Sequence, residues 1–337
     1  MDGEKDTLER VLEVATREHD ELIASRRTAS NSRAPIHRLP DEILREIFVE
    51  AGGRIVGYTC RLWRQITLDI PWLWRDIHFA FSRDAPLSFE MADIWIQRSR
   101  TVPLKFTIVV HERVIALQLH LDTIAHFFAP HWPRCSSLTA TYMGNRAVPL
   151  LFPSLVPESM PILQHLDVRI YGSALLPQEI PLAFYPRLSS LSVTSGIPIS
   201  LLGPSPSLAS VALDIRTLRI EALQSVISAF SNLRSLTWSC HYIDRPQRLN
   251  DTPVITLPPS IVELNLNGDG ALYAAKRISG PSVRSLSIHE NWYGVGMDYR
   301  KAFPTEHFPE LRLFDVRSDN QYSMEFEDPL YTSVTDF

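Results

Sequence analysis

The sequence has few of the residues that mark secreted, membrane-spanning or redox-active proteins. Its 337 residues include three cysteines, Cys60, Cys135 and Cys240, and no Cys-x-x-Cys pair. This odd number and wide spacing exclude a closed disulfide framework and a cysteine-pair metal or redox motif. No apolar run approaches the roughly 20 residues of a membrane-spanning helix, and the charged N-terminus lacks the apolar stretch of a secretory signal. We therefore expect a cytoplasmic or nuclear protein with no membrane partner.

The chain also lacks the positive charge that favours binding to nucleic acid. Its formal net charge is -5 and its isoelectric point is about 6.1, which gives no general attraction to phosphate backbones. Hydrophobic residues make up 45% of the chain and charged residues 21%, as is ordinary for a globular protein with a sizeable core. We predict one large or two modest domains and no nucleic-acid partner.

Motifs of common enzymes are missing as well. There is no Gly-x-Ser-x-Gly elbow, no phosphate-binding Walker loop and no His-Glu-x-x-His pair. His111 and Glu112 are followed by Ile115 where the metalloprotease motif requires its second histidine. We therefore predict that the protein is not an enzyme and has no catalytic residues, no metal site and no cofactor.

The N-terminal segment, residues 1–33, combines an expected helix with an expected linker. Apolar residues recur at roughly helical spacing between residues 6 and 25, which predicts an amphipathic helix. Glu18 and His19 interrupt its apolar face, so the pattern does not favour a long coiled coil. Residues 25–33 are polar and without apolar periodicity, which predicts a linker.

A clear helix start follows at Pro40. Proline is tolerated in the first turn of a helix, where its missing N–H would be unpaired, and Asp41 and Glu42 suit the positive end of the helix dipole. A continuous apolar stripe follows, made of Ile43, Leu44, Ile47 and Phe48.

A second helix is predicted over residues 58–66, after glycines at positions 52, 53 and 57 interrupt helical character. It places Cys60 and Trp63 on one side. Pro71 and the aromatic residues Trp72 and Trp74 then close the segment. These pieces predict a compact helical module.

Residues 34–80 resemble the F-box, particularly that of fungal F-box proteins. The resemblance rests on Leu-Pro-x-Glu-Ile-Leu-x-x-Ile-Phe at 39–48, Cys-x-x-Trp-Arg-x-Ile at 60–66 and Pro-x-Leu-Trp at 71–74. It implies a module that binds a Skp-type adaptor and, through it, a cullin of a ubiquitin ligase. By this resemblance, the residues that form or support the adaptor surface are Leu39, Pro40, Ile43, Leu44, Ile47, Phe48, Cys60 and Trp63.

A short phrase, often opened by proline, recurs through the rest of the chain. It reads Pro-x-apolar-x-x-Leu-x-apolar, as at 161–168, 186–193 and 309–316. Alternate apolar residues point to one side of a strand, and one such unit cannot bury that side alone, so the pattern predicts stacked repeats with parallel strands. The central residues recur every 20 to 28 positions, a leucine-rich-repeat period. They are Leu138, Leu166, Leu191, Val211, Leu236, Leu264, Leu286 and Phe314.

Residues 81–318 resemble the irregular leucine-rich repeats that commonly follow an F-box. The resemblance implies a solenoid whose parallel strands line a concave face. Polar residues between the buried leucines would lie on that face and contact a target protein. The predicted target-binding residues are His165, Asp167, Arg169, Glu263, Asn265 and His289.

Taken together, these patterns predict an α/β protein with a helical F-box-like module at 34–80 and an irregular leucine-rich-repeat solenoid at 81–318. Residues 319–337 are predicted to form an acidic tail or cap. The leading hypothesis is a substrate-recognition subunit of an SCF-type (cullin-RING) E3 ubiquitin ligase, which docks the adaptor and holds an unknown target protein. The glycines after Phe48 replace a leucine-bearing helix of the family. They motivate the alternative, a leucine-rich-repeat interaction scaffold with a vestigial F-box.

Overall fold

The computed structural model divides the chain into two compact units. The helical unit comprises residues 1–76 and 93–102, and the sheet unit comprises residues 77–92 and 103–337. Gly53, Cys240 and the predicted acidic tail at 319–337 lie outside the described residues. The structure describes residues 2–52, 54–81, 89–111, 126–143, 160–171, 182, 185–194, 205, 207–214, 223–224, 227–228, 230–239, 255–268, 270–290 and 307–318.

The helical unit opens with one long helix, α1 (Asp2–Ser32), which includes most of the stretch expected as a linker. That stretch holds neither glycine nor proline, and its alanine and three arginines favour helix. The helix therefore ends close to Pro35, the first proline of the chain. None of the helices in the described part of the chain is both long and apolar enough to cross a membrane. The following elements are η1 (Pro35–Arg38), α2 (Asp41–Glu50), η2 (Arg54–Tyr58), α3 (Arg61–Leu68) and η3 (Pro71–Trp74).

Helix α2 begins and ends as its sequence predicts. Pro40 caps its start, and the first turn carries two acidic residues. At its end, the Ala51 N–H donates to the Ile47 carbonyl at 2.8 Å and the Gly52 N–H to the Val49 carbonyl at 3.1 Å. Gly52 has a φ of +66°, in the left-handed region where glycine is least strained. Gly52 thus ends the helix.

A small aromatic core joins α2 to α3. The rings of Phe48 and Trp63 lie 4.9 Å apart between centroids, and the Trp74 indole N–H donates to the Thr67 carbonyl at 3.0 Å. Helix α4 (Phe89–Arg98) adds Trp95, which packs against this core. The fully buried members of the core are Leu44, Phe48, Ile66, Ile70, Leu73 and Trp74.

Gly57 allows η2 to lie close against α3. A Cβ atom at Gly57 would stand 2.7 Å from the Thr67 hydroxyl oxygen, closer than van der Waals contact permits. The Arg64 side-chain Nε also donates to the Gly57 carbonyl at 3.2 Å. Gly57 is therefore required by packing inside the helical unit.

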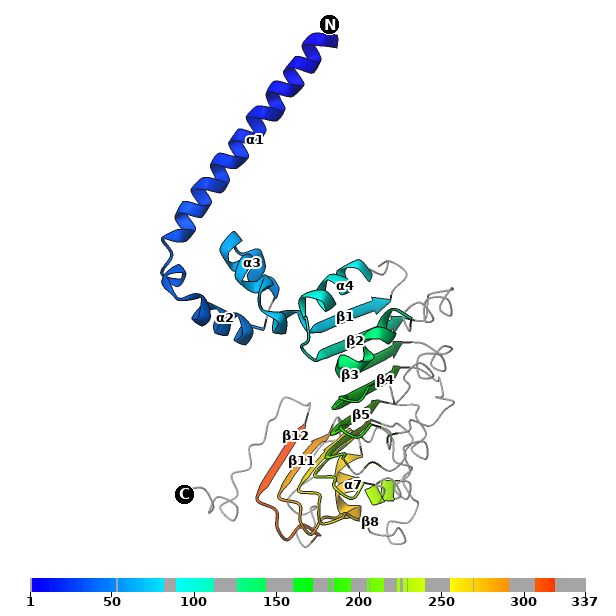
Figure 1. Cartoon of the computed structure of the whole chain (residues 1–337). Coiled ribbons are helices and arrows are strands. Elements are labelled where there is room, and N and C mark those ends of the chain that lie inside the picture. Colours follow the sequence, from blue (N-terminus) through cyan, green and yellow to red (C-terminus); the bar gives the residue numbers. More distant parts are fainter. Residues whose placement is uncertain are drawn as a thin grey trace. The chain divides into compact units, whose positions relative to one another are not determined.

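The sheet unit is built around a ten-stranded sheet, in which the colours of Figure 1 run in order from cyan at β1 to orange-red at β12. Every neighbouring pair from β2 to β12 is parallel. The predicted α/β class with a parallel sheet is therefore confirmed. The strands are β1 (Asp76–Phe81), β2 (Leu104–His111), β3 (Cys135–Met143), β4 (His165–Tyr171), β5 (Ser190–Thr194), β6 (Ser210–Asp214), β7 (Ser235–Ser239), β9 (Glu263–Asn267), β11 (Ser285–Glu290) and β12 (Leu313–Ser318).

Shorter elements lie between these strands. Helix α7 (Ala271–Arg277) contacts β9 and β11, and its residues Ala271, Ala274 and Ala275 are fully buried. These small side chains let the helix approach the strands closely. The remaining elements are η4 (Ala129–Arg134) and the two-stranded parallel pair β8 (Ile255–Thr256) and β10 (Ile278–Ser279).

The central residues of the repeated phrase form one row across the sheet. Leu138 is in register with Leu166, Leu166 with Leu191, and so on through Leu286 with Phe314. Seven of these eight side chains are at most 3% exposed, Phe314 on the last strand being the exception. The segments that connect the strands therefore differ in length, which accounts for the spacing of 20 to 28 residues, while the register between strands stays the same.

The prolines of the phrase occupy a turn that precedes the strands. The Leu163 N–H donates to the Met160 carbonyl at 3.2 Å, and the Leu311 N–H donates to the Phe308 carbonyl at 3.1 Å. Pro161 and Pro309 stand second in these turns, where the fixed φ of proline is favourable. The same hydrogen bond recurs before β5, β7, β9 and β11. The turn directs each chain segment into the sheet.

The packing of Gly57 predicts a specific loss of stability. Gly57→Ala should lower the free energy of unfolding by roughly 1–3 kcal/mol because the added methyl group overlaps the Thr67 hydroxyl. Chemical denaturation would measure the loss, and Gly57→Ala in a Thr67→Ala background is the matched control. Equal losses in both backgrounds would contradict this packing.

Burial predicts the reactivity of Cys135. Desolvation raises the pKa of its thiol to about 12, so at pH 8 roughly one molecule in ten thousand carries the thiolate. Cys135 should resist alkylation in the native protein, while the half-buried Cys60 reacts first. Mass spectrometry of peptides after timed alkylation would show the order. Native Cys135 reacting as fast as the same residue in denatured chain would refute it.

Candidate functional site

An exposed apolar stripe runs along α2 and the residues just before it. Leu39, Ile43 and Ile47 are 38%, 42% and 39% exposed. Ile43 and Ile47 lie four residues apart in α2 and therefore on the same side of the helix, and Leu39 precedes Ile43 by the same spacing. Pro40, at the start of this segment, is also exposed. We call Leu39, Ile43 and Ile47 the apolar stripe.

The other two predicted residues of α2 lie on the adjacent, buried side of the helix. Leu44 and Phe48 are each 1% exposed and belong to the aromatic core. They hold α2 against Trp63 of α3, and so they fix the direction in which the apolar stripe points. In this position they support an exposed surface without being part of it.

Cys60 and Trp63 are half-buried and connect α3 to the segment before α2. The His37 Nε2 atom lies 3.8 Å from the Cys60 sulfur, and the rings of His37 and Trp63 are 6.1 Å apart. The Trp63 indole N–H is buried without a hydrogen-bond partner. These contacts tether η1, and with it the start of the apolar stripe, to α3.

Charged side chains border the apolar stripe. Glu42 and Glu46 are exposed on α2 beside the stripe, whereas Arg45, on the far side of the helix, lies 4.0 Å from Asp69, which is also 4.0 Å from Arg100. Exposed pairs at such a distance contribute little to stability, about 0–1 kcal/mol each. An apolar centre with a charged rim is the usual composition of a protein-binding surface.

Sequence reasoning missed several exposed apolar residues of the helical unit. They lie mainly in the short η2 and η3 segments and on α3, where no helical periodicity is long enough to separate a buried from an exposed side. The guanidinium of Arg75 lies 4.8 Å from the ring centroid of Trp72, one of these residues. The missed residues are Val49, Ile55, Tyr58, Leu62, Leu68 and Trp72.

The predicted target-binding residues begin on β4. Arg169 donates two hydrogen bonds to the same Asp167 carboxylate oxygen, from Nε at 2.9 Å and from a terminal nitrogen at 2.6 Å. The hydrogen bonds and charge of Asp167 raise the pKa of Arg169 above its ordinary value. The second carboxylate oxygen of Asp167 is buried without a partner. His165 is exposed on the same side of the strand.

The other predicted target-binding residues lie on β9 and β11. Glu263 is exposed, and the Asn265 side-chain amide donates to the Thr237 hydroxyl at 3.3 Å. His289 is in register with Asn267 of β9. Because β5, β6 and β7 separate β4 from β9, the β9 residues lie roughly 19 Å from the β4 group, and His289 on β11 lies roughly 24 Å from it. The structure therefore forms two polar groups instead of one site.

Small residues fill the same sheet face between the two polar groups. In each of β5, β6 and β7 the burial alternates, with half-buried residues on this face and fully buried residues on the other. The half-buried residues are Ser190, Ser192, Thr194, Ser210, Ala212, Asp214, Ser235, Thr237 and Ser239. This face offers hydroxyl groups and little apolar surface.

Comparisons with known proteins add no assignment to these surfaces. No group of three His, Cys, Asp or Glu side chains in the described ranges could hold a metal ion. No protein-family model matches the chain, and no curated protein is found to match it.

Proposed function

We propose that this chain is a substrate-recognition subunit of an SCF-type (cullin-RING) E3 ubiquitin ligase. In this proposal, the helical unit is an F-box that docks a Skp-type adaptor, and the sheet unit is a leucine-rich-repeat domain that holds a target protein. The chain positions the target while the ligase partners transfer ubiquitin in the cytoplasm or nucleus. The observation that carries the proposal is the apolar stripe on the helix encoded by the Leu-Pro-x-Glu-Ile-Leu phrase.

The chemistry of the apolar stripe supports adaptor docking. Ile43 and Ile47 of α2 and Leu39 just before it remain partly exposed, while Leu44 and Phe48 hold the buried side of the helix in place. When a partner covers these side chains, the binding free energy becomes more favourable by roughly 25 cal/mol for each Å² of apolar surface that is buried. Little conformational entropy is lost because the surface is already held in place. A rigid apolar stripe with a charged border therefore suits a stable protein partner.

The arrangement of the sheet supports the repeat half of the proposal. Strands β3 to β7, β9, β11 and β12 each carry one copy of the phrase and follow one another across the sheet in chain order. Asp167 and Arg169, two of the predicted target-binding residues, form an ion pair at 2.6 Å. We therefore assign the first target contact to β4, with β9 and β11 as a second contact for a large protein target.

A second candidate function is an interaction scaffold with a vestigial F-box. The glycines after Phe48 favour it, because Gly52 and Gly57 serve the packing of the helical unit whether or not an adaptor binds. A scaffold would have the same fold and would bind a protein partner through the sheet. The two functions therefore differ in adaptor binding alone.

Adaptor binding can be tested with two matched substitutions on one helix. Ile43 and Val49 are 42% and 41% exposed on α2, but Val49 lies away from the apolar stripe. Ile43→Asp should weaken binding to a purified Skp-type adaptor by at least about 30-fold, because a charge replaces a buried apolar contact. Val49→Asp should change affinity by less than about threefold. Calorimetric titration of the folded full-length chain measures both.

The outcomes separate the two candidate functions. Thermal unfolding of each variant, followed by circular dichroism, shows whether the helical unit remains intact. A folded wild-type chain that fails to bind the adaptor would leave the scaffold and eliminate the ligase role. Equal losses for Ile43→Asp and Val49→Asp would place adaptor binding elsewhere on the helical unit.

A further inference from the structure

Two segments of the helical unit contain arginine as their only charged residue type. Residues 22–40 hold four arginines and residues 51–68 hold three, and neither segment contains lysine, aspartate or glutamate. The whole chain, by contrast, has a formal net charge of -5. Positive charge is therefore concentrated in these two segments. Their arginines are Arg26, Arg27, Arg33, Arg38, Arg54, Arg61 and Arg64.

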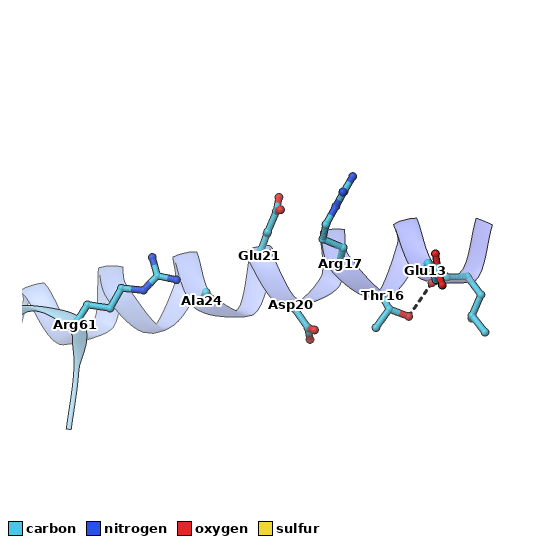
Figure 2. Close-up of a pocket in the computed structure, with 8 residues that line it drawn as sticks. Glu13, Thr16, Arg17, Asp20, Glu21, Ala24 and Arg61 are labelled. Atoms are coloured by element: carbon cyan, nitrogen blue, oxygen red, sulfur yellow. Dashed lines mark hydrogen bonds between the residues drawn. The ribbon is translucent and has the colours of Figure 1, made fainter. Parts of the chain in front are cut away.

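The fold brings the two segments together. The His37 Nε2 atom of the first lies 3.8 Å from the Cys60 sulfur of the second. Arg61 of α3 and Ala24 of α1 line one shallow pocket, whose residues are drawn in Figure 2. Arg27 comes three residues, or about one turn, after Ala24 and therefore lies on the same side of α1. Arg27 and Arg61 thus stand at the same end of this pocket.

Arg64 and Tyr58 extend this positive surface along α3 and η2. Arg64 follows Arg61 by one turn of α3, so their side chains are neighbours. The Arg64 Nε atom donates to the Gly57 carbonyl at 3.2 Å, which leaves its terminal N–H groups for a ligand. Tyr58, the next residue of η2, is 76% exposed. We call Arg27, Arg61, Arg64 and Tyr58 the arginine patch.

The arginine patch has hydrogen-bonding capacity that the helical unit does not use. Arg27 and Arg61 are both exposed, and neither forms an ion pair or side-chain hydrogen bond with any residue that the structure describes. The helix dipole does not account for Arg27, because the last turn of α1 carries no basic residue. Like charges held close together destabilise the fold slightly unless a negative charge lies between them. A partner can supply that negative charge.

We infer that the arginine patch binds a short acidic segment of a partner protein. Each guanidinium can donate two parallel N–H bonds to one aspartate or glutamate carboxylate. Tyrosine and arginine are also the residues that most often dominate binding energy at protein interfaces. An apolar side chain of the segment would pack against the exposed ring of Tyr58. This inference goes beyond the proposed ligase function and does not depend on adaptor binding, because the patch contains no residue of the apolar stripe.

Acidic residues on either side of the arginine patch favour a short ligand. Asp20 and Glu21 precede it on α1, Asp41 and Glu42 begin α2, and Asp69 ends α3, and all of these are exposed. A nucleic acid or an anionic membrane carries negative charge over a long distance and would also meet these carboxylates. The net negative charge of the chain gives no long-range attraction to such polyanions either. A short acidic segment avoids both sources of repulsion.

Binding is tested with a fluorescent synthetic peptide in which glutamate alternates with leucine and phenylalanine. Its fluorescence anisotropy is measured as the folded full-length chain is added. The same peptide with glutamine in place of glutamate is the matched control. The wild-type chain should bind the glutamate peptide at least about tenfold more tightly than the glutamine peptide. This difference should shrink as the salt concentration rises.

Charge reversals locate the binding site on the chain. Arg27→Glu and Arg61→Glu should each weaken binding of the glutamate peptide at least about tenfold, because an attractive contact becomes repulsive. Arg187→Glu makes the same change of net charge at an exposed position of the sheet unit and should alter affinity by less than about threefold. Arg61→Lys keeps the charge but lacks the two-pronged geometry, so it should weaken binding about threefold. Circular dichroism shows whether each variant remains folded.

Several results would overturn the inference. They are failure of the folded wild-type chain to bind the glutamate peptide, and equal losses for Arg61→Glu and Arg187→Glu. Tighter binding of single-stranded DNA, or of vesicles that contain phosphatidylserine, would assign the patch to a polyanion instead. Ile43→Ser, on the apolar stripe, should leave the affinity for the peptide unchanged to within about threefold. A larger loss for this variant would place peptide binding on the stripe and contradict a separate site.

Discussion

The structure of the sheet unit depends on burial of alternate residues in parallel strands that share one register. A single strand of five to nine residues cannot remove its apolar side chains from water, but neighbours on both sides can cover them. The row from Leu138 to Leu286 satisfies this requirement strand by strand. Register is fixed because a slip of one residue would expose the whole apolar set. The segments between strands are then free to vary in length.

Burial of apolar side chains in each unit leaves two chemically different surfaces exposed. The exposed side of β4 to β11 carries hydroxyl, amide and charged groups, which suit recognition by directional hydrogen bonds. The helical unit buries Leu44 and Phe48 and leaves Leu39, Ile43 and Ile47 partly in water. An apolar surface of this kind suits a constitutive partner, whereas a polar face suits selection among partners. The proposed division between adaptor and target follows from this difference.

The sequence predicted the parallel sheet because the phrase repeats within the strands themselves. It also predicted the start of α2, since Pro40 and its acidic neighbours act locally. It did not predict the continuation of α1 beyond Ser25. The stretch is polar and was therefore interpreted as a linker, although it contains no glycine or proline that would end a helix. The separation of His165 from Glu263 could not be predicted either, because it depends on how many strands lie between their repeats. The function of Gly57 depends on contact with Thr67, which sequence spacing does not reveal.

The central claim is that the apolar stripe is an adaptor-binding surface on a unit that acts independently of the sheet. Hydrogen exchange of the full chain, measured by mass spectrometry with and without a purified Skp-type adaptor, tests this claim most directly. The account predicts slower exchange in peptides that cover residues 39–50 and 60–68, with β4 to β12 unchanged. Complex formation with protection confined to the sheet, or no change in any peptide, would contradict it.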